Sequence, residues 1–198
     1  MITKTPATVE DLYHIPENGK AELVNGEIVR MSPTGVAPGR AGGEIYFSLR
    51  VFEEEHDGGC AFPDNVGFIV NLPHRKSFSP DAAWFAGEAE GMKFAQGAPT
   101  FAVEVRSESD YGPKAEQAIL DKVRDYLAAG TQVVWDVDLL SDDVIRKYTV
   151  ETLTIRQIFR KGEIADAKPA VPGWRMPVDR LFKTRNHESQ ENSTLNSQ

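Results

Sequence analysis

Residues 100–138, TFAVEVRSESDYGPKAEQAILDKVRDYLAAGTQVVWDVD, decide the fold that the sequence predicts. Two strand-like runs, 100–107 and 131–138, flank a helix-like run at 113–129 that has a proline in its first turn and a glycine at its end. A strand joined through one helix to the next strand forms a parallel pair, and such a unit is right-handed. We expect site residues to gather at the ends of these two strands.

The rest of the chain reads as shorter elements around this unit. The pair Asn25-Gly26 between two apolar runs predicts a β-hairpin at 21–31. Residues 32–43 read as a loop from their glycine and proline content, either a functional flap or a mobile loop. The other expected elements are a helix capped by Thr8, a helix at 44–56, and strands at 65–72, 80–85, 144–150 and 152–159. This order predicts an α/β or α+β domain with a mixed central sheet flanked by helices.

Composition and charge limit the classes of function that the chain can have. The 198 residues are 40% hydrophobic, enough for one domain, which we place at 1–182, and the polar tail 183–198 is expected to be disordered. A net charge of -8 argues against a protein that holds nucleic acid by bulk positive charge, although a local basic patch is still compatible with it. The single cysteine, Cys60, excludes an intrachain disulfide and a cysteine metal cluster. Because no apolar run approaches the roughly 18 residues of a spanning helix, we expect no membrane association and a cytoplasmic protein.

Two carboxylates interrupt otherwise apolar strands. Asp81 follows Pro80 within FSPDAAWFAG (78–87), and Glu104 lies in the middle of TFAVEVRS, on the face that also carries Arg106. A carboxylate in such a run is expensive to bury unless it is paired. If the two strands are adjacent, the carboxylates would face and repel each other, and a divalent cation between them would resolve the repulsion.

A third polar group, Lys122, lies at the border of the apolar stripe of the helix at 113–129. From there it can lean toward the sheet and position a nucleophile or stabilise developing negative charge. Each residue also has an ordinary structural interpretation. Asp81 could be a strand-end aspartate, Glu104 could pair with Arg106, and Lys122 could be a surface lysine. Only the combination of the three favours a metal site.

An aspartate, a glutamate and a lysine in this order, around a strand pair and the following helix, resemble the PD-(D/E)XK nuclease core. The succession of ELVNGEIVRMSP, SPDAAWF, VEVRSES, K-x-x-x-Y-L-A-A-G and VVWDVD is also similar to the Uma2 (Uma-two) family of bacterial proteins, which is grouped with restriction endonucleases. The resemblance covers residues 8–182 and leaves out the tail. It implies a restriction-endonuclease-like fold and Mg²⁺-dependent cleavage of phosphodiester bonds in DNA, with Mn²⁺ as an alternative ion.

Carried over to this chain, the resemblance makes Asp81 and Glu104 metal-binding carboxylates, together with the carbonyl oxygen of Val105. Lys122 matches the lysine of the K-x-x-x-Y motif and would orient the attacking water. The usual lysine two places after the glutamate is Arg106 here. This departure leaves two roles open for the arginine: a contact to the substrate phosphate, or a pair with Glu104.

The resemblance also implies a role for Glu22, which matches an acidic position of the family and would be an additional ligand or base. A nuclease acting on DNA could work as a homodimer that places one site on each strand. Two other functions stay open at this point. One is a non-catalytic interaction protein that has kept the fold, and the other is a hydrolase for a small phosphodiester or nucleotide. The acidic balance of the chain favours both.

Overall fold

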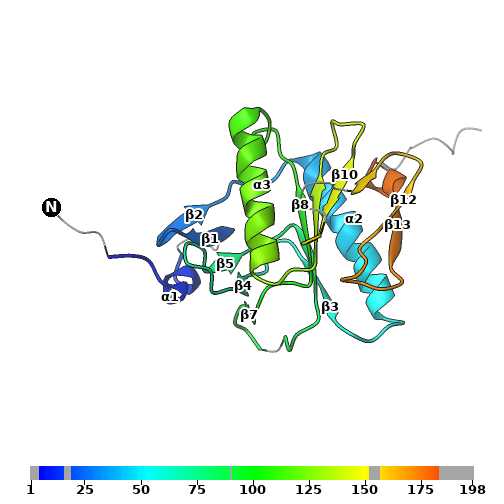
Figure 1. The fold of residues 1–198 in the computed structure, drawn as a ribbon. Coiled ribbons are helices and arrows are strands. Elements are labelled where there is room, and N and C mark those ends of the chain that lie inside the picture. The colour runs from blue at the N-terminus through cyan, green and yellow to red at the C-terminus, as the bar shows by residue number, and fades with distance from the viewer. Residues whose placement is uncertain (1–4, 16–18, 90, 152–156, 183–198) are drawn as a thin grey trace, which may run out of the picture.

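The structure, a computed structural model, describes residues 5–15, 19–89, 91–151 and 157–182. Its centre is a sheet of six described strands, which are β3 (Cys60–Pro63), β6 (Ala82–Phe85), β8 (Phe101–Val105), β9 (Val133–Val137), β10 (Ile145–Tyr148) and β11 (Gln157–Phe159). Their spatial order is β11-β10-β9-β8-β6-β3 (Figure 1). β8 and β9 are parallel, and the other neighbouring pairs are antiparallel. The predicted mixed sheet is therefore confirmed.

The parallel pair is the crossover that the sequence predicts, with α3 (Pro113–Ala128) between its two strands. The register runs from Phe101 opposite Val133 to Val105 opposite Val137. Parallel strands end at the same edge of a sheet, so the segments that follow Val105 and Val137 leave from one place. This edge carries the candidate site.

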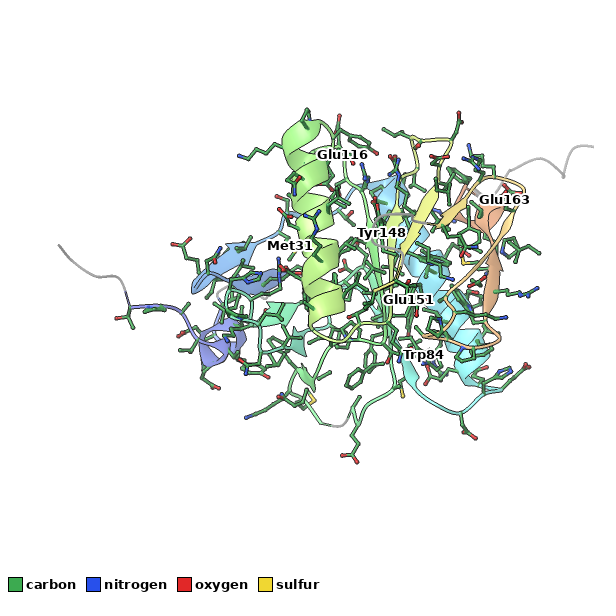
Figure 2. The ribbon with its side chains drawn as sticks, viewed as in Figure 1. Met31, Trp84, Glu116, Tyr148, Glu151 and Glu163 are labelled. Carbon is green, nitrogen blue, oxygen red and sulfur yellow. The ribbon has the colours of Figure 1, made fainter. Side chains whose placement is uncertain are left out.

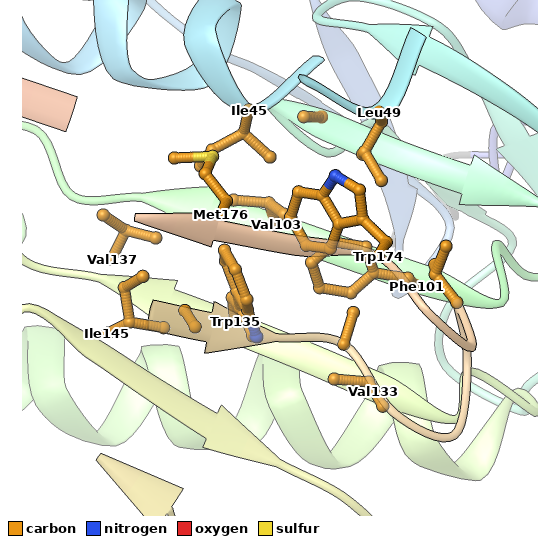
Figure 3. Close-up of a cluster of buried hydrophobic side chains, with 14 of the residues drawn as sticks. Ile45, Leu49, Phe101, Val103, Val133, Trp135, Val137, Ile145, Trp174 and Met176 are labelled. Atoms are coloured by element: carbon orange, nitrogen blue, oxygen red, sulfur yellow. The ribbon is translucent and has the colours of Figure 1, made fainter. Parts of the chain in front are cut away.

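Different elements cover the two faces of the sheet. One face packs against α2 (Val36–Glu53), β12 (Ile164–Asp166), β13 (Arg175–Pro177) and η2 (Val178–Phe182). The other face packs against α3 and a small sheet of β4 (Phe68–Ile69), β5 (Ser77–Phe78) and β7 (Ala95–Gln96), as Figure 1 shows. In the core on the α2 side, the ring of Trp135 lies 5.3 Å from that of Trp174 and 5.1 Å from that of Phe101 (Figure 3). The alternation along β8 thus sends its odd-numbered residues into this core, and Glu104 to the α3 side.

The predicted hairpin forms at the N-terminal end. It consists of β1 (Ala21–Val24) and β2 (Glu27–Arg30), and α1 (Val9–Tyr13) precedes it. Asn25 and Gly26 both have positive φ, at 52° and 72°, which is what a two-residue hairpin turn of this type requires. Thr8 caps α1 through Asp11. The Lys76 amide donates to the Leu23 carbonyl, so the hairpin is joined to the small sheet beside α3.

The prediction of a loop at 32–43 is wrong for most of its length, because α2 begins at Val36 instead of at 44. Glycine and proline content is a poor guide here, since Gly35 is the N-cap and Pro38 falls in the first turn, where a proline is tolerated. Gly42 has a packing role inside the helix. A Cβ on it would lie 3.3 Å from the carbonyl oxygen of Asp81, so the glycine lets α2 approach the candidate site closely.

Some predicted elements are shorter in the structure or fall beyond its described part. The strand expected at 65–72 is limited to β4. The residues that follow β4 form a turn, in which the Val70 amide donates to the Lys76 carbonyl. Residues 152–156 of the predicted last strand and the predicted tail 183–198 lie outside the described residues. None of the described helices combines the length and the apolar character needed to cross a membrane.

Candidate active site

Asp81 stands at the entrance to β6, next to the end of β8. Its amide donates to the Val103 carbonyl at 2.9 Å, and its carboxylate oxygen Oδ2 accepts from the Val105 amide at 2.7 Å. Both the backbone and the side chain of Asp81 are therefore held against β8. Pro80 has no backbone N–H to donate to a neighbouring strand, so a proline is tolerated here, just before β6 begins.

Glu104 projects from β8 toward α3, as the alternation predicts. Its two carboxylate oxygens have separate partners: the Tyr126 hydroxyl donates to Oε1 at 2.6 Å, and the Lys122 ammonium lies 2.9 Å from Oε2. Burial raises the pKa of Glu104, Lys122 opposes that rise, and the charge of nearby Asp81 adds to it. The net pKa of Glu104 is above the ordinary value, mainly because the carboxyl is buried, with a further contribution from the charges of Asp81 and Glu22.

Lys122 joins Glu104 to Glu22, with its ammonium 3.0 Å from the Glu22 carboxylate. Burial would lower the pKa of Lys122, but the two carboxylates outweigh burial and raise it above the ordinary value. The side chain is therefore an ammonium, which can donate hydrogen bonds and cannot accept a proton. The K-x-x-x-Y spacing puts Tyr126 one helical turn further along the same face, which is why both side chains reach Glu104.

Glu22 is buried behind Lys122. Besides the lysine, its carboxylate accepts from the Ser79 amide at 3.0 Å and from the Arg75 guanidinium, which also pairs with Asp125. Burial raises the pKa of Glu22, yet the charges of Lys122 and Arg75 lower it to below the ordinary value. These contacts fit a residue that holds Lys122 in place. A role for Glu22 as an additional ligand or base stays a prediction.

The alternative pair between Arg106 and Glu104 does not form. The Arg106 guanidinium instead makes two hydrogen bonds of 2.7 Å to Asp136 on β9 and pairs with Glu116 on α3. The side chain of Arg106 is only 3% exposed and that of Asp136 only 1%. The expectation fails because Arg106 follows the last residue of β8, where the neighbouring strand and the helix both offer carboxylates. A contact from Arg106 to phosphate stays a prediction.

Sequence reasoning missed Lys20. Its ammonium lies 2.6 Å from Asp81 and 2.7 Å from Asp64, and the side chain is 15% exposed. Lys20 precedes β1, and 61 positions separate it from Asp81, so no local pattern could have linked the two. Burial lowers the pKa of Lys20, but the charges of Asp81 and Glu104 and the hydrogen bonds to Asp64 and Asp81 outweigh burial and raise the pKa above the ordinary value.

These side chains line a cleft with a volume of about 1530 Å³. One wall is formed by residues 30–38, and the other by residues 104–111 and α3. Figure 2 shows Met31 beside the middle of α3, and Glu116 at the N-terminal end of that helix. Asp81, Glu104, Lys122 and Lys20 all contribute to the lining, so all four are accessible from the cleft.

The donor set suits a hard cation that needs few protein ligands. Within the described ranges, no three His, Cys, Asp or Glu side chains are grouped to hold a metal ion. Mg²⁺, however, commonly takes one or two carboxylates and keeps several waters. Asp81 and Glu104 would supply two carboxylates, since both line the cleft and the Val105 amide holds the Asp81 carboxylate beside the strand that carries Glu104. The residues present therefore fit such an ion.

Comparisons with known proteins bear on the family and the fold of the chain. A sequence model of a family described as "Putative restriction endonuclease" matches residues 7–179. A crystal structure described as a "putative nuclease belonging to DUF820", from Anabaena variabilis, is similar with a TM-score of 0.70 at 17% identity, over 89% of this chain and 98% of that one. At this identity the likeness shows the fold alone. No curated protein matches the chain.

Proposed function

This chain belongs to the Uma2 family, and from that premise we propose that it is a Mg²⁺-dependent endonuclease that hydrolyses phosphodiester bonds of DNA. The observation that carries the proposal is the meeting of Asp81, Glu104 and Lys122 at one cleft, although two strands and a helix supply them. Their order resembles that of a PD-(D/E)XK core, with the lysine supplied by α3 and an arginine, Arg106, two places after the glutamate. Action as a homodimer, with one site for each strand of a duplex, is part of the same proposal.

In this proposal Asp81, Glu104 and the carbonyl oxygen of Val105 hold the metal. The Val105 amide already donates to Asp81, and the amide and carbonyl of one residue in a strand point to the same side. The bound ion, Mg²⁺ or Mn²⁺, would polarise the phosphate and lower the pKa of a bound water.

Lys122 would orient the attacking water and stabilise the negative charge that develops on the phosphate. Its raised pKa supports donation of hydrogen bonds and argues against a role as general base. Glu22 and Glu104 hold the ammonium from two sides, so the donor is in place before a substrate arrives. Tyr126 supports the same geometry by holding the other oxygen of Glu104.

The test is cleavage of single- and double-stranded DNA by the purified protein with Mg²⁺ or Mn²⁺. We expect Asp81→Asn and Lys122→Met each to lower the rate by about 100-fold, the usual scale for losing one stabilising group in a transition state. Glu88→Gln, which changes an exposed carboxylate away from the cleft, should leave the rate unchanged. DNA that stays intact at high concentrations of wild-type protein with either ion would contradict the proposal.

A second candidate is hydrolysis of a short phosphodiester, and the charge of the cleft favours it. Within the described residues, six acidic and four basic side chains line the cleft: Asp64, Asp81, Glu104, Glu108, Asp110 and Asp136 against Lys20, Arg30, Arg106 and Lys122. Three of these cations are already paired with carboxylates. Long DNA is held mainly by free cations that neutralise its phosphates.

The two candidates differ in how cleavage depends on salt and on length. A duplex substrate should give cleavage that weakens steeply with salt, by roughly 0.9 in the log–log slope for each phosphate contacted. A dinucleotide or a short single strand should give a shallow slope, about 0.7 for each of the few phosphates contacted, and each of its bonds should be cleaved about as fast as a bond in long DNA. Binding of either substrate with no cleavage would favour the third interpretation, a non-catalytic protein that keeps the fold.

A further inference from the structure

Lys20 is the strongest feature of the cleft that the proposed chemistry does not use. Its ammonium contacts two carboxylates at once, Asp81 at 2.6 Å and Asp64 at 2.7 Å. Lys20 comes from the segment before the hairpin, Asp64 follows β3, and Asp81 precedes β6. Three segments that are distant in the sequence thus meet around one positive charge.

The position of this charge matters because Asp81 is one of the two proposed metal ligands. Oδ2 of Asp81 is held by the Val105 amide, and Oδ1 is the atom that Lys20 contacts. The charge of Lys20 also acts on Glu104, the other proposed ligand. The ammonium therefore pairs directly with one of the two carboxylates that a divalent cation would bind, Asp81, and lowers the pKa of the other, Glu104.

We propose that Lys20 is a resident counter-cation that competes with the divalent metal for Asp81, and that Asp64 keeps the ammonium when the metal binds. The inference rests on the metal site of the proposed function and adds a residue to it. Without an ion, the Lys20 ammonium lowers the repulsion between Asp81 and Glu104. With an ion, Asp81 turns its Oδ1 to the metal and Lys20 retains its pair with Asp64.

Asp64 makes the exchange feasible. A buried ammonium that lost its single partner would be strongly destabilised, so a lysine held by Asp81 alone would resist the metal. Asp64 already lies within 2.7 Å, and its side chain is 45% exposed, so it can keep the lysine without a larger rearrangement. A lysine suits this role better than an arginine, because its ammonium is a compact charge on a flexible stem with no fixed donor geometry.

The first experiment measures Mg²⁺ and Mn²⁺ affinity by calorimetry for the wild type, Lys20→Gln and Asp64→Asn. We expect Lys20→Gln to bind the metal about tenfold more tightly, the effect of losing one charge-assisted contact at Asp81. Asp64→Asn should bind the metal more weakly than the wild type, because Lys20 then depends on Asp81. Lys93→Gln is the control, since it removes the same charge from an exposed position outside the cleft.

The second experiment follows Lys20 in the wild-type chain, so that it does not depend on how well a variant folds. Lysines are labelled with an amine-acylating reagent with and without Mg²⁺, and labelling is measured by mass spectrometry. We expect Mg²⁺ to increase the labelling of Lys20 several-fold and to leave Lys93 unchanged. Unchanged or reduced labelling of Lys20 at saturating Mg²⁺ would overturn the inference.

The outcomes separate this inference from the proposed function. Metal binding that Lys20→Gln leaves unchanged or weakens removes the role of Lys20 but keeps the metal site. Tighter binding in Lys20→Gln without any DNA cleavage keeps the inference and removes the nuclease. Absence of metal binding in both wild type and Lys20→Gln overturns both.

Discussion

Two charged clusters lie side by side at the end of β8, and they are built in different ways. The closed cluster consists of Arg106, Glu116 and Asp136, and the open cluster of Lys20, Asp81, Glu104 and Lys122. They are neighbours because Glu104 and Asp136 face each other across β8 and β9. In the closed cluster Arg106 and Asp136 are almost fully buried against each other, and Glu116 is about half exposed. Members of both clusters line the cleft, but in the open cluster every side chain stays partly exposed, between 15% and 23%.

The difference between the two clusters indicates that the charges of the closed cluster stabilise the fold and that those of the open cluster are available to bind a ligand. The planar guanidinium of Arg106 matches Asp136 with two parallel hydrogen bonds, a geometry that few ligands could improve. The open cluster uses lysines, which change partners more easily. It also leaves Glu104 beside the charge of Asp81. Such an arrangement is unfavourable for stability and favourable for binding a cation.

The largest effect is expected when the closed cluster is broken by Arg106→Met. This change leaves the carboxylate of Asp136 buried, with Arg146 at 3.4 Å as its remaining cation. We expect the free energy of unfolding to fall by about 3 kcal/mol, as for other buried pairs that lose one partner. Urea denaturation measures it.

Arg124→Met is the matched control for that prediction. Arg124 pairs with Asp121 on α3, and both side chains are more than half exposed. Its loss should change the free energy of unfolding by less than about 0.5 kcal/mol. Equal effects of the two substitutions would mean that the closed cluster does not stabilise the fold.

The open cluster should respond in the opposite way to Glu104→Gln. The glutamine keeps the shape of the side chain but removes a negative charge that lies near Asp81 and Glu22. We expect the unfolding free energy to stay within about 1 kcal/mol of the wild type, or to rise, because binding sites often carry groups that reduce stability. Metal affinity should fall by at least about tenfold.

Calorimetry and urea denaturation on the same samples check both halves of this prediction. A loss of stability as large as that of Arg106→Met, with metal affinity unchanged, would make Glu104 a structural residue. The comparison between the two clusters would then have no functional meaning.

The two clusters also differ in how far the sequence predicts them. Asp81 and Glu104 stand out because each interrupts an apolar strand, and Lys122 stands out at the border of an apolar helical stripe. The structure brings these three together, and it confirms the parallel crossover and the hairpin. Patterns of period 2 and 3.6 report which face a side chain takes, and this was enough to find the carboxylates.

Partners that depend on tertiary packing could not be predicted in this way. Lys20 reaches Asp81 across 61 positions, and Arg106 reaches Asp136 across 30. The early start of α2 has the same cause. Gly42 is accommodated in the helix because its missing Cβ leaves room for the Asp81 carbonyl oxygen, and that contact exists only in the folded chain. Local glycine content therefore predicts a loop where packing forms a helix.

A smaller loss of stability than for Arg106→Met is expected for Tyr126→Phe. This substitution tests whether Tyr126 holds Glu104 in the open cluster. The hydroxyl donates to Glu104 at 2.6 Å, and the ring stacks on Phe78 with 3.9 Å between centroids. Phenylalanine keeps the stacking and loses the hydrogen bond, so we expect a loss of about 1 kcal/mol in unfolding free energy. In the Glu104→Gln background the same substitution should cost less, and a double-mutant cycle measures the difference. Additive effects would mean that Tyr126 does not hold Glu104.

The smallest effect concerns an ion pair on the opposite side of the sheet, which belongs to neither cluster. Lys147 lies 2.6 Å from Asp166. Burial raises the pKa of Asp166, but hydrogen bonds from Lys147 and the Lys168 amide outweigh it and bring that pKa below the ordinary 3.8. A carboxyl with a lowered folded pKa stabilises the fold fully above its unfolded pKa. That contribution is lost as the pH falls through the lower, folded value.

We therefore expect the wild type to exceed Asp166→Asn in unfolding free energy by about 0.5 kcal/mol at pH 6, and the gap to close at pH values well below 3.8. Urea denaturation of both proteins at several pH values measures this gap. A gap that stays constant with pH would show that the asparagine changes packing and not charge. A gap that closes with pH would show that Asp166, like Asp136 of the closed cluster, stabilises the fold through its charge. Glu104 of the open cluster would differ from both if its replacement by glutamine leaves the stability unchanged.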